Sequence, residues 1–112
     1  MKDTLYLLAP DFKDQGETYF CPYSAQVTGF LAYYPQLRDT VDVVELPFEK
    51  PRRPLSDVLG EEHQAPPMLV LAGEPVAVPR VTVGHANGRY FVGKTIEILR
   101  YLAATRGVPT PH

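Results

Sequence analysis

The sequence predicts an α/β fold, a three-layer sandwich in which helices cover a mixed sheet of four to five strands. A strand, an amphipathic helix and a second strand follow one another in the first 46 residues, which is the pattern of a βαβ unit. The dipeptide Asn87-Gly88 stands between two apolar segments and is typical of a tight hairpin, and a final helix follows it. Because βαβ crossovers are right-handed, the first two strands should lie parallel in one sheet, and an antiparallel second half should complete it.

Nine segments follow in order, and most of the twelve prolines stand between them rather than inside them. They are a strand over 4–9, a loop over 11–20, a helix over 22–35, a strand over 41–46, a short helix over 55–60, a strand over 68–72, strands over 81–83 and 90–92, and a helix over 95–106.

The first βαβ unit is predicted from apolar spacing and proline. Residues 4–9 form an apolar run that Pro10 ends, as expected of a buried strand, and 11–20 mixes acidic residues with a lysine and a glycine, as expected of a loop. Pro22 suits the first turn of a helix, because an N–H there has no partner to lose. The apolar residues that follow recur at helical spacing: Val27, Phe30, Leu31 and Tyr34.

The second half is predicted from the same kinds of signal. Residues 41–46 are β-branched and apolar with acids between them, and 68–72 is wholly apolar and therefore central in the sheet. Gly60 ends the short helix. For the last helix, Thr95 suits the N-cap and Gly107 the C-terminal end. Its expected apolar face consists of Ile96, Leu99, Leu102 and Ala103.

Composition excludes several classes of protein. The chain has 112 residues, the length of one domain, and 11 basic against 13 acidic residues give a net charge of −2, which argues against a nucleic-acid-binding protein. No apolar run approaches the roughly 20 residues that a membrane span needs, and no signal-peptide pattern follows the start, so a cytoplasmic protein is expected. One cysteine and three histidines without ligand spacing predict neither a disulfide nor a metal site. The oligomeric state stays open.

The single cysteine lies in Cys21-Pro22-Tyr23-Ser24, at the expected start of the first helix. Free N–H groups and a partial positive charge at a helix N-terminus stabilise a thiolate, which is the nucleophilic form. Acidic residues in the preceding loop oppose this, but salt screens them. The alternative is an inert, buried cysteine that acts as a small apolar residue.

These residues resemble the thioredoxin fold in its glutaredoxin-like form. The resemblance covers the Cys-Pro-Tyr-Ser segment and the run Ala65-Pro66-Pro67-Met68-Leu69-Val70-Leu71, in which Pro67 lies 67 − 21 = 46 residues after Cys21. It implies that Pro67 is a cis-proline facing the thiol, whereas sequence alone would favour the trans form. Nearly the whole chain also resembles a bacterial thioredoxin-like family of unknown function, through the segments 51–54, 58–64, 67–71, 98–103 and 107–109.

The resemblance also implies monothiol chemistry. Ser24 stands where dithiol members carry a second cysteine, so only Cys21 can exchange with a mixed disulfide such as that of glutathione. Cys21, Ser24 and Pro67 are the implied catalytic residues; Ser24 is alternatively an ordinary first-turn residue. The candidates for ligand binding are Pro22, Tyr23, Arg52, Arg53, Gln64, Pro66 and Thr95.

Several of these candidates have a second interpretation. Pro66 lacks the N–H that glutaredoxins offer to glutathione, and Lys94-Thr95 replace an acidic residue and a serine that hold its γ-glutamyl group in glutathione transferases. The Arg52-Arg53 pair suits a carboxylate, but it is alternatively a solvated basic loop. Tyr23 could stack on a ligand or cover the sheet edge.

Two functions of different class follow. One is a thiol-disulfide oxidoreductase or glutathione-dependent transferase that acts through Cys21. The other is a non-catalytic module that binds a protein partner and keeps a vestigial motif. A third possibility is an iron–sulfur cluster bridged by glutathione between two subunits, because each would supply one thiolate.

Overall fold

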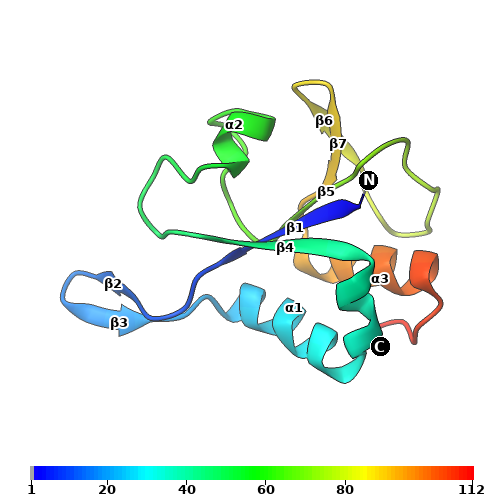
Figure 1. The fold of residues 1–112 in the computed structure, drawn as a ribbon, viewed down its shortest axis with the longest axis horizontal. Coiled ribbons are helices and arrows are strands. Elements are labelled where there is room, and N and C mark those ends of the chain that lie inside the picture. Colours follow the sequence, from blue (N-terminus) through cyan, green and yellow to red (C-terminus); the bar gives the residue numbers. More distant parts are fainter. Residues whose placement is uncertain (1) are drawn as a thin grey trace.

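A computed structural model describes residues 2–112 (Figure 1). Its elements are β1 (Asp3–Leu8), β2 (Phe12–Asp14), β3 (Glu17–Tyr19), α1 (Pro22–Tyr33), the 3₁₀-helix η1 (Pro35–Asp39), β4 (Val41–Leu46), α2 (Leu55–Leu59), β5 (Met68–Val70), β6 (Gly84–Ala86), β7 (Arg89–Val92) and α3 (Thr95–Arg106). Five of the strands form one sheet in the order β4-β1-β5-β7-β6.

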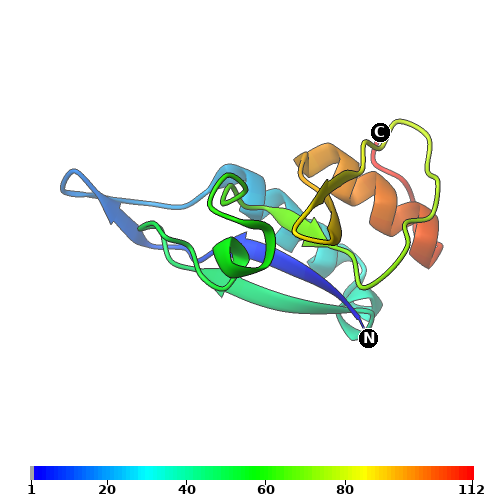
Figure 2. The same cartoon turned by 90° about the horizontal axis from the view of Figure 1, so that it is seen from above.

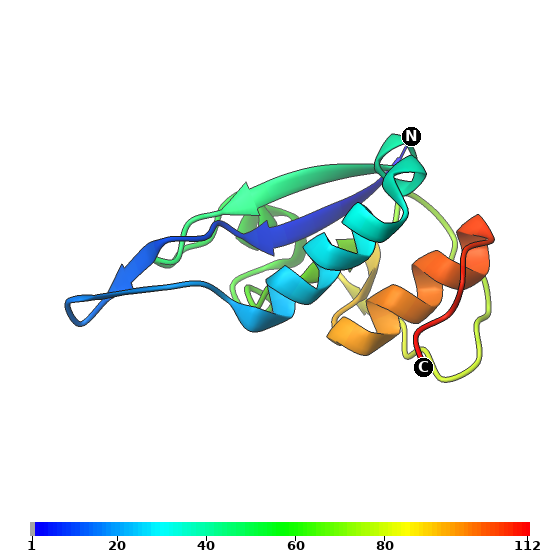
Figure 3. The ribbon, with the colours of Figure 1, turned by 90° about the horizontal axis from the view of Figure 1, so that it is seen from below.

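The predicted three-layer α/β sandwich is confirmed. Helices α1 and α3 lie on one side of the sheet and α2 on the other (Figures 1 and 3). Because successive side chains of a strand point to opposite faces, β1 contributes to both interfaces. Leu5 and Leu7 belong to the larger core, with residues of α1 and α3, whereas Tyr6 belongs to a second core with Leu55 and Leu59 of α2.

The sheet has the predicted mixed topology. Strands β1 and β4 run parallel, with Asp3 opposite Val41, and β5 runs antiparallel to β1 and to β7. The prediction that 68–72 supplies a central strand is confirmed for Met68–Val70, which is buried throughout. The carboxyl end of β1 and the start of α1 meet at one end of the sheet, and this is where the candidate site lies.

The loop expected over 11–20 is instead a hairpin of β2 and β3 that projects from the body of the protein (Figure 2). Its turn, Gln15-Gly16, has positive φ at both residues (51° and 86°), as a two-residue hairpin turn requires. The ring of Phe12 stacks on Phe48, with 4.5 Å between ring centroids, and this contact joins the hairpin to the segment after β4.

The hairpin predicted at Asn87-Gly88 exists, but its first strand is Gly84–Ala86 rather than 81–83. Asn87 and Gly88 both have positive φ, so the turn has two residues and pairs Ala86 with Arg89 directly. The first residue pair of β6 and β7 therefore lies directly next to the turn, and β6 includes Ala86.

The last helix begins and ends where the sequence predicts, with two differences at its start. Lys94 occupies the N-cap position without a side-chain hydrogen bond, and Thr95 is the first helical residue. Ile96, expected on the apolar face, is 39% exposed, whereas Leu99, Leu102 and Ala103 are buried. Gly107 ends the helix in the left-handed conformation, as predicted. Among residues 2–112, no helix is long and apolar enough to span a membrane.

Candidate functional site

Cys21 is the N-cap residue of α1. Its extended backbone (φ −82°, ψ 115°) lets its carbonyl accept the first helical hydrogen bond, from the Ala25 amide at 3.0 Å. The Sγ atom accepts a hydrogen bond from the Ser24 amide at 3.4 Å, and the residue is partly exposed. A thiolate at this position would therefore accept a hydrogen bond from one N–H group and lie at the positive end of the helix dipole.

The Ser24 side chain has a structural contact. Its Oγ accepts a hydrogen bond from the Leu8 amide at 3.0 Å, and the residue is buried. Leu8 ends β1, so this bond joins the first turn of α1 to the end of the strand. The Ser24 hydroxyl therefore has a structural contact that suits an ordinary first-turn residue. It is the backbone amide of Ser24, and not its hydroxyl, that contacts the Cys21 sulfur.

Cys21 lines a hollow of about 260 Å³ between β1, α1 and β4. The lining comprises Leu7, Leu8, Pro10, Phe20, Cys21, Ser24, Ala25, Thr28 and Glu45. Glu45 is the one charged residue in this lining. Close by on the projecting hairpin, Tyr19 donates a hydrogen bond to Glu17 at 3.0 Å, which raises the pKa of Tyr19 above its ordinary value of 10.0.

A second hollow, of about 430 Å³, brings together four of the predicted ligand-binding and catalytic residues, Tyr23, Pro66, Pro67 and Thr95. The Pro66–Pro67 peptide bond is cis, as the resemblance implied. Lys94 is the one charged residue in the lining, and the remaining residues are Gln26, Ala65, Gly93 and Ile96. The hollow joins the start of α1, the entry to β5 and the start of α3.

The two hollows share no lining residue. Cys21 and Ser24 line the first, and Tyr23 and Pro67 line the second, which we call the proline groove. The first turn of α1 therefore contributes residues to both hollows. Pro22, the first residue of the helix, is exposed beside them.

The remaining predicted ligand residues contact each other or the surface instead. The Arg52 amide donates to Gln64 Oε1 at 2.6 Å, and the Arg52 guanidinium donates to the carbonyls of Phe48 and Gln64 at 2.8 and 3.1 Å. Arg53 forms an exposed ion pair with Asp57 at 3.5 Å. Arg52 and Gln64 therefore join the loops on either side of α2, Arg53 pairs with Asp57 at the surface, and none of the three lines either hollow.

The lining includes polar residues that were not predicted as site residues, among them Gln26 and Glu45. Gln26 lies three residues after Tyr23, which places it on the same side of α1, so helical spacing could have indicated it. Glu45 is opposite Leu7 in the parallel pair of β1 and β4, and it could have been found only by aligning the two strands.

Within residues 2–112, no group of three or more histidine, cysteine or carboxylate side chains could hold a metal ion. No curated protein and no solved structure matches the chain. Residues 2–110 match the family described as "Protein of unknown function (DUF3088)". The match spans nearly the whole chain, and the protein therefore belongs to this family.

Proposed function

We propose that this protein is a monothiol, glutaredoxin-like thiol-disulfide oxidoreductase that uses Cys21 as its nucleophile. The observation that carries the proposal is the position of the Cys21 sulfur. The sulfur lies at the N-terminus of a twelve-residue helix and accepts a hydrogen bond from the Ser24 amide, and Cys21 is partly exposed. The Ser24 N–H and the positive end of the helix dipole lie at this sulfur, and the thiolate is the form of a cysteine that attacks a disulfide.

The reaction would be the exchange of glutathione between thiols. The Cys21 thiolate attacks the glutathione sulfur of a mixed disulfide, a new Cys21–glutathione disulfide forms, and the substrate leaves as a thiolate. A second glutathione thiolate then attacks the glutathione sulfur held on Cys21. Oxidised glutathione leaves, and the Cys21 thiolate is restored. The cycle frees the substrate thiol, consumes one reduced glutathione and releases both glutathione sulfurs as oxidised glutathione, so no second cysteine is needed.

The proline groove suits a peptide-like ligand at the start of α1, the helix that Cys21 caps. Tyr23 is 59% exposed and offers an aromatic face next to Pro66 and Pro67. Lys94 and the first amides of α3 offer positive charge for a carboxylate. Pro66 has no N–H, so it can offer the ligand only its carbonyl oxygen.

The test is the removal of glutathione from a glutathionylated peptide in the presence of reduced glutathione. The wild type should accelerate the reaction at least about tenfold over the same mixture without protein. Mass spectrometry of the protein should show the gain of one glutathione, on Cys21.

Cys21→Ser is the decisive variant, because serine is a preferred N-cap and should keep the helix start intact. It should retain the far-UV circular dichroism of the wild type and lose the acceleration. Wild-type protein with no acceleration, or a Cys21→Ser variant as active as the wild type, would overturn the proposal.

A second candidate is a non-catalytic module that binds a peptide of a partner protein in the proline groove. It is favoured by one observation, that Cys21 lines a different hollow from Pro66 and Pro67. This function requires saturable changes in the NMR signals of Tyr23, Lys94 and Thr95 on peptide addition, equal in the wild type and in Cys21→Ser. A ligand effect that disappears in Cys21→Ser favours the oxidoreductase.

A further inference from the structure

The loop between β5 and β6 is held along α3 by side chains of that helix (Figures 1 and 2). The amides of Val76 and Thr82 in this loop donate hydrogen bonds to α3 side chains at 3.1 and 2.7 Å. Between these two points, Nη1 of Arg100 donates to the Arg80 carbonyl at 3.2 Å. Three contacts therefore fix the path of the loop and hold Arg80 beside Arg100.

A hollow of about 210 Å³ lies between this loop, α3 and the segment that follows α3. Its polar lining residues are Arg80, Arg100 and Thr110, and the others are apolar: Val78, Pro79, Ala103, Ala104 and Val108. None of these residues is acidic. We call this space the arginine hollow, and it shares no lining residue with the thiol's hollow or the proline groove.

The two arginines of the hollow have no acidic partner in the described part of the chain, because the ion pairs of the structure lie elsewhere. The one acidic residue of α3, Glu97, is buried and accepts a hydrogen bond from the Thr82 amide. Two like charges therefore line one small space without a countercharge, in a chain whose net charge is −2.

The Arg100 guanidinium also has a donor without an acceptor. Its Nε atom is buried and has no hydrogen-bond partner among residues 2–112. Buried donors are nearly always paired, so this nitrogen calls for a further acceptor. Because Nη1 is bound to the Arg80 carbonyl, the edge that remains is the one formed by Nε and Nη2. This edge of a guanidinium can donate two parallel hydrogen bonds to a carboxylate.

We propose that the arginine hollow binds a small organic carboxylate. The Nε–Nη2 edge of Arg100 holds the two carboxylate oxygens, and the Arg80 guanidinium supplies a second positive charge. A planar acceptor with two oxygens matches this edge, which a lysine cannot reproduce. The apolar body of the ligand lies on the valines and alanines of the lining. The inference does not depend on the chemistry of Cys21.

The probe is benzoate, and its matched control is benzamide, which has the same ring without the charge. In NMR titrations at constant ionic strength, benzoate should shift the backbone signals of Arg80, Arg100 and Thr110 saturably, and benzamide should not. Inorganic phosphate, titrated in the same way, tests whether any anion suffices.

Variants assign the binding to the two arginines. Arg100→Lys keeps the charge but loses the two-donor edge, and it should raise the benzoate dissociation constant at least about tenfold. Arg80→Gly suits the left-handed backbone of this residue (φ 61°), so it removes the second guanidinium and keeps the loop, and it should raise the dissociation constant roughly threefold. Arg38→Lys changes an exposed arginine outside the hollow and should bind like the wild type. Circular dichroism checks that each variant is folded.

Several results would overturn the proposal. One is a wild type without saturable shifts at the arginine hollow up to about 50 mM benzoate. Others are binding that both Arg100→Lys and Arg80→Gly leave unchanged, shifts confined to residues outside the hollow, and benzamide that binds as tightly as benzoate. Phosphate that binds as tightly as benzoate would show that charge alone suffices, and it would overturn the assignment to a carboxylate.

Discussion

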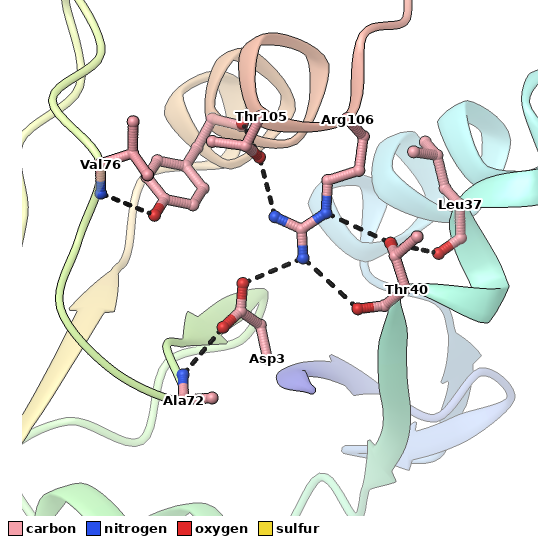
Figure 4. A network of polar contacts seen from close by, with 8 residues as sticks. Asp3, Leu37, Thr40, Ala72, Val76, Thr105 and Arg106 are labelled. Carbon is pink, nitrogen blue, oxygen red and sulfur yellow. Dashed lines mark hydrogen bonds and ion pairs between the residues drawn. The ribbon is translucent and has the colours of Figure 1, made fainter. Parts of the chain in front are cut away.

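Arg106, in the last turn of α3, forms an ion pair at 2.9 Å with Asp3, the first residue of β1, across 103 residues of sequence (Figure 4). The same guanidinium donates to the Thr40 and Thr105 hydroxyls at 3.2 and 2.8 Å. Asp3 also accepts a hydrogen bond from the Ala72 amide at 2.8 Å. One arginine thus joins α3 to the start of β1, to the residue before β4 and, through Asp3, to the segment that follows β5.

Because both partners are mostly shielded from water (14% and 17% exposed), loss of Arg106 would leave a poorly solvated carboxylate without its partner. Arg106→Ala should lower the free energy of unfolding by about 2–3 kcal/mol, measured by urea denaturation. Asp3→Asn keeps an acceptor for the Ala72 amide and should cost less.

The exposed pair of Arg53 and Asp57 is the matched control, with side chains 70% and 62% exposed. Arg53→Ala should change the free energy of unfolding by less than about 0.5 kcal/mol, because water screens the pair. If Arg106→Ala and Arg53→Ala lower the free energy of unfolding equally, the Asp3–Arg106 network does not stabilise the fold more than an exposed pair does.

Ser24→Ala should separate stability from thiol chemistry. It removes the acceptor of the buried Leu8 amide and should lower the free energy of unfolding by about 1–3 kcal/mol. The rate at which iodoacetamide alkylates Cys21 should stay within about twofold, because the hydrogen bond to the sulfur comes from the Ser24 backbone. A tenfold loss of alkylation rate with unchanged stability would instead assign the hydroxyl to the reaction.

Gln64→Ala should destabilise the fold through the loops on either side of α2. The buried side chain accepts from the Arg52 amide and donates to the Glu61 carbonyl at 2.9 Å, so its removal leaves two backbone groups without partners. The expected loss is about 1–3 kcal/mol in urea unfolding. Glu62→Ala, two residues earlier and exposed, is the control and should be within about 0.5 kcal/mol of the wild type.

Two glycines should respond to alanine in opposite directions. A Cβ at Gly84 would clash with the ring of Phe91, its partner across the β6–β7 hairpin, so Gly84→Ala should cost about 1–3 kcal/mol. Gly29 lies in α1 with open space around it, and Gly29→Ala should add up to about 1 kcal/mol through helix propensity. Thermal unfolding of the two variants gives the sign of each effect. A loss of stability in both variants would contradict the gain expected for Gly29→Ala.

The regular elements could be predicted where local chemistry decides them. Val27, Phe30 and Leu31 recur at helical spacing between two prolines, and α1 occupies that interval with these residues buried. The β2–β3 hairpin was missed because its residues are mostly exposed and show no apolar alternation. The local signal for it was Gln15-Gly16, a pair that adopts positive φ.

The candidate site could be predicted only in part, because its residues meet through long-range packing. Tyr23, Pro66 and Thr95 line one hollow, because the fold brings the start of α1, the entry to β5 and the start of α3 together. The contacts of Arg52 with Gln64 depend on how two loops fold over α2, and no sequence periodicity encodes that.

Tyr6 should make the stability of the protein depend on alkaline pH. The side chain is 5% exposed and packs in the second core with Leu46 and Leu55. Burial raises the pKa of Tyr6 above its ordinary value of 10.0, and the positive charge of Arg89 partly opposes the shift. The folded protein therefore holds this proton more tightly than the unfolded chain does. Its contribution to stability is complete below the unfolded pKa and is lost as pH rises through the folded pKa.

Tyr6→Phe keeps the ring and removes the titrating group. Relative to the wild type, the variant should gain stability as pH rises from about 8 to about 11, because only in the wild type does unfolding expose a Tyr6 phenol that can then ionise. Urea denaturation at both pH values measures the difference, with Tyr33→Phe as the control, since that side chain is 81% exposed. If Tyr6→Phe loses stability in parallel with the wild type over this range, groups other than Tyr6 govern the alkaline transition.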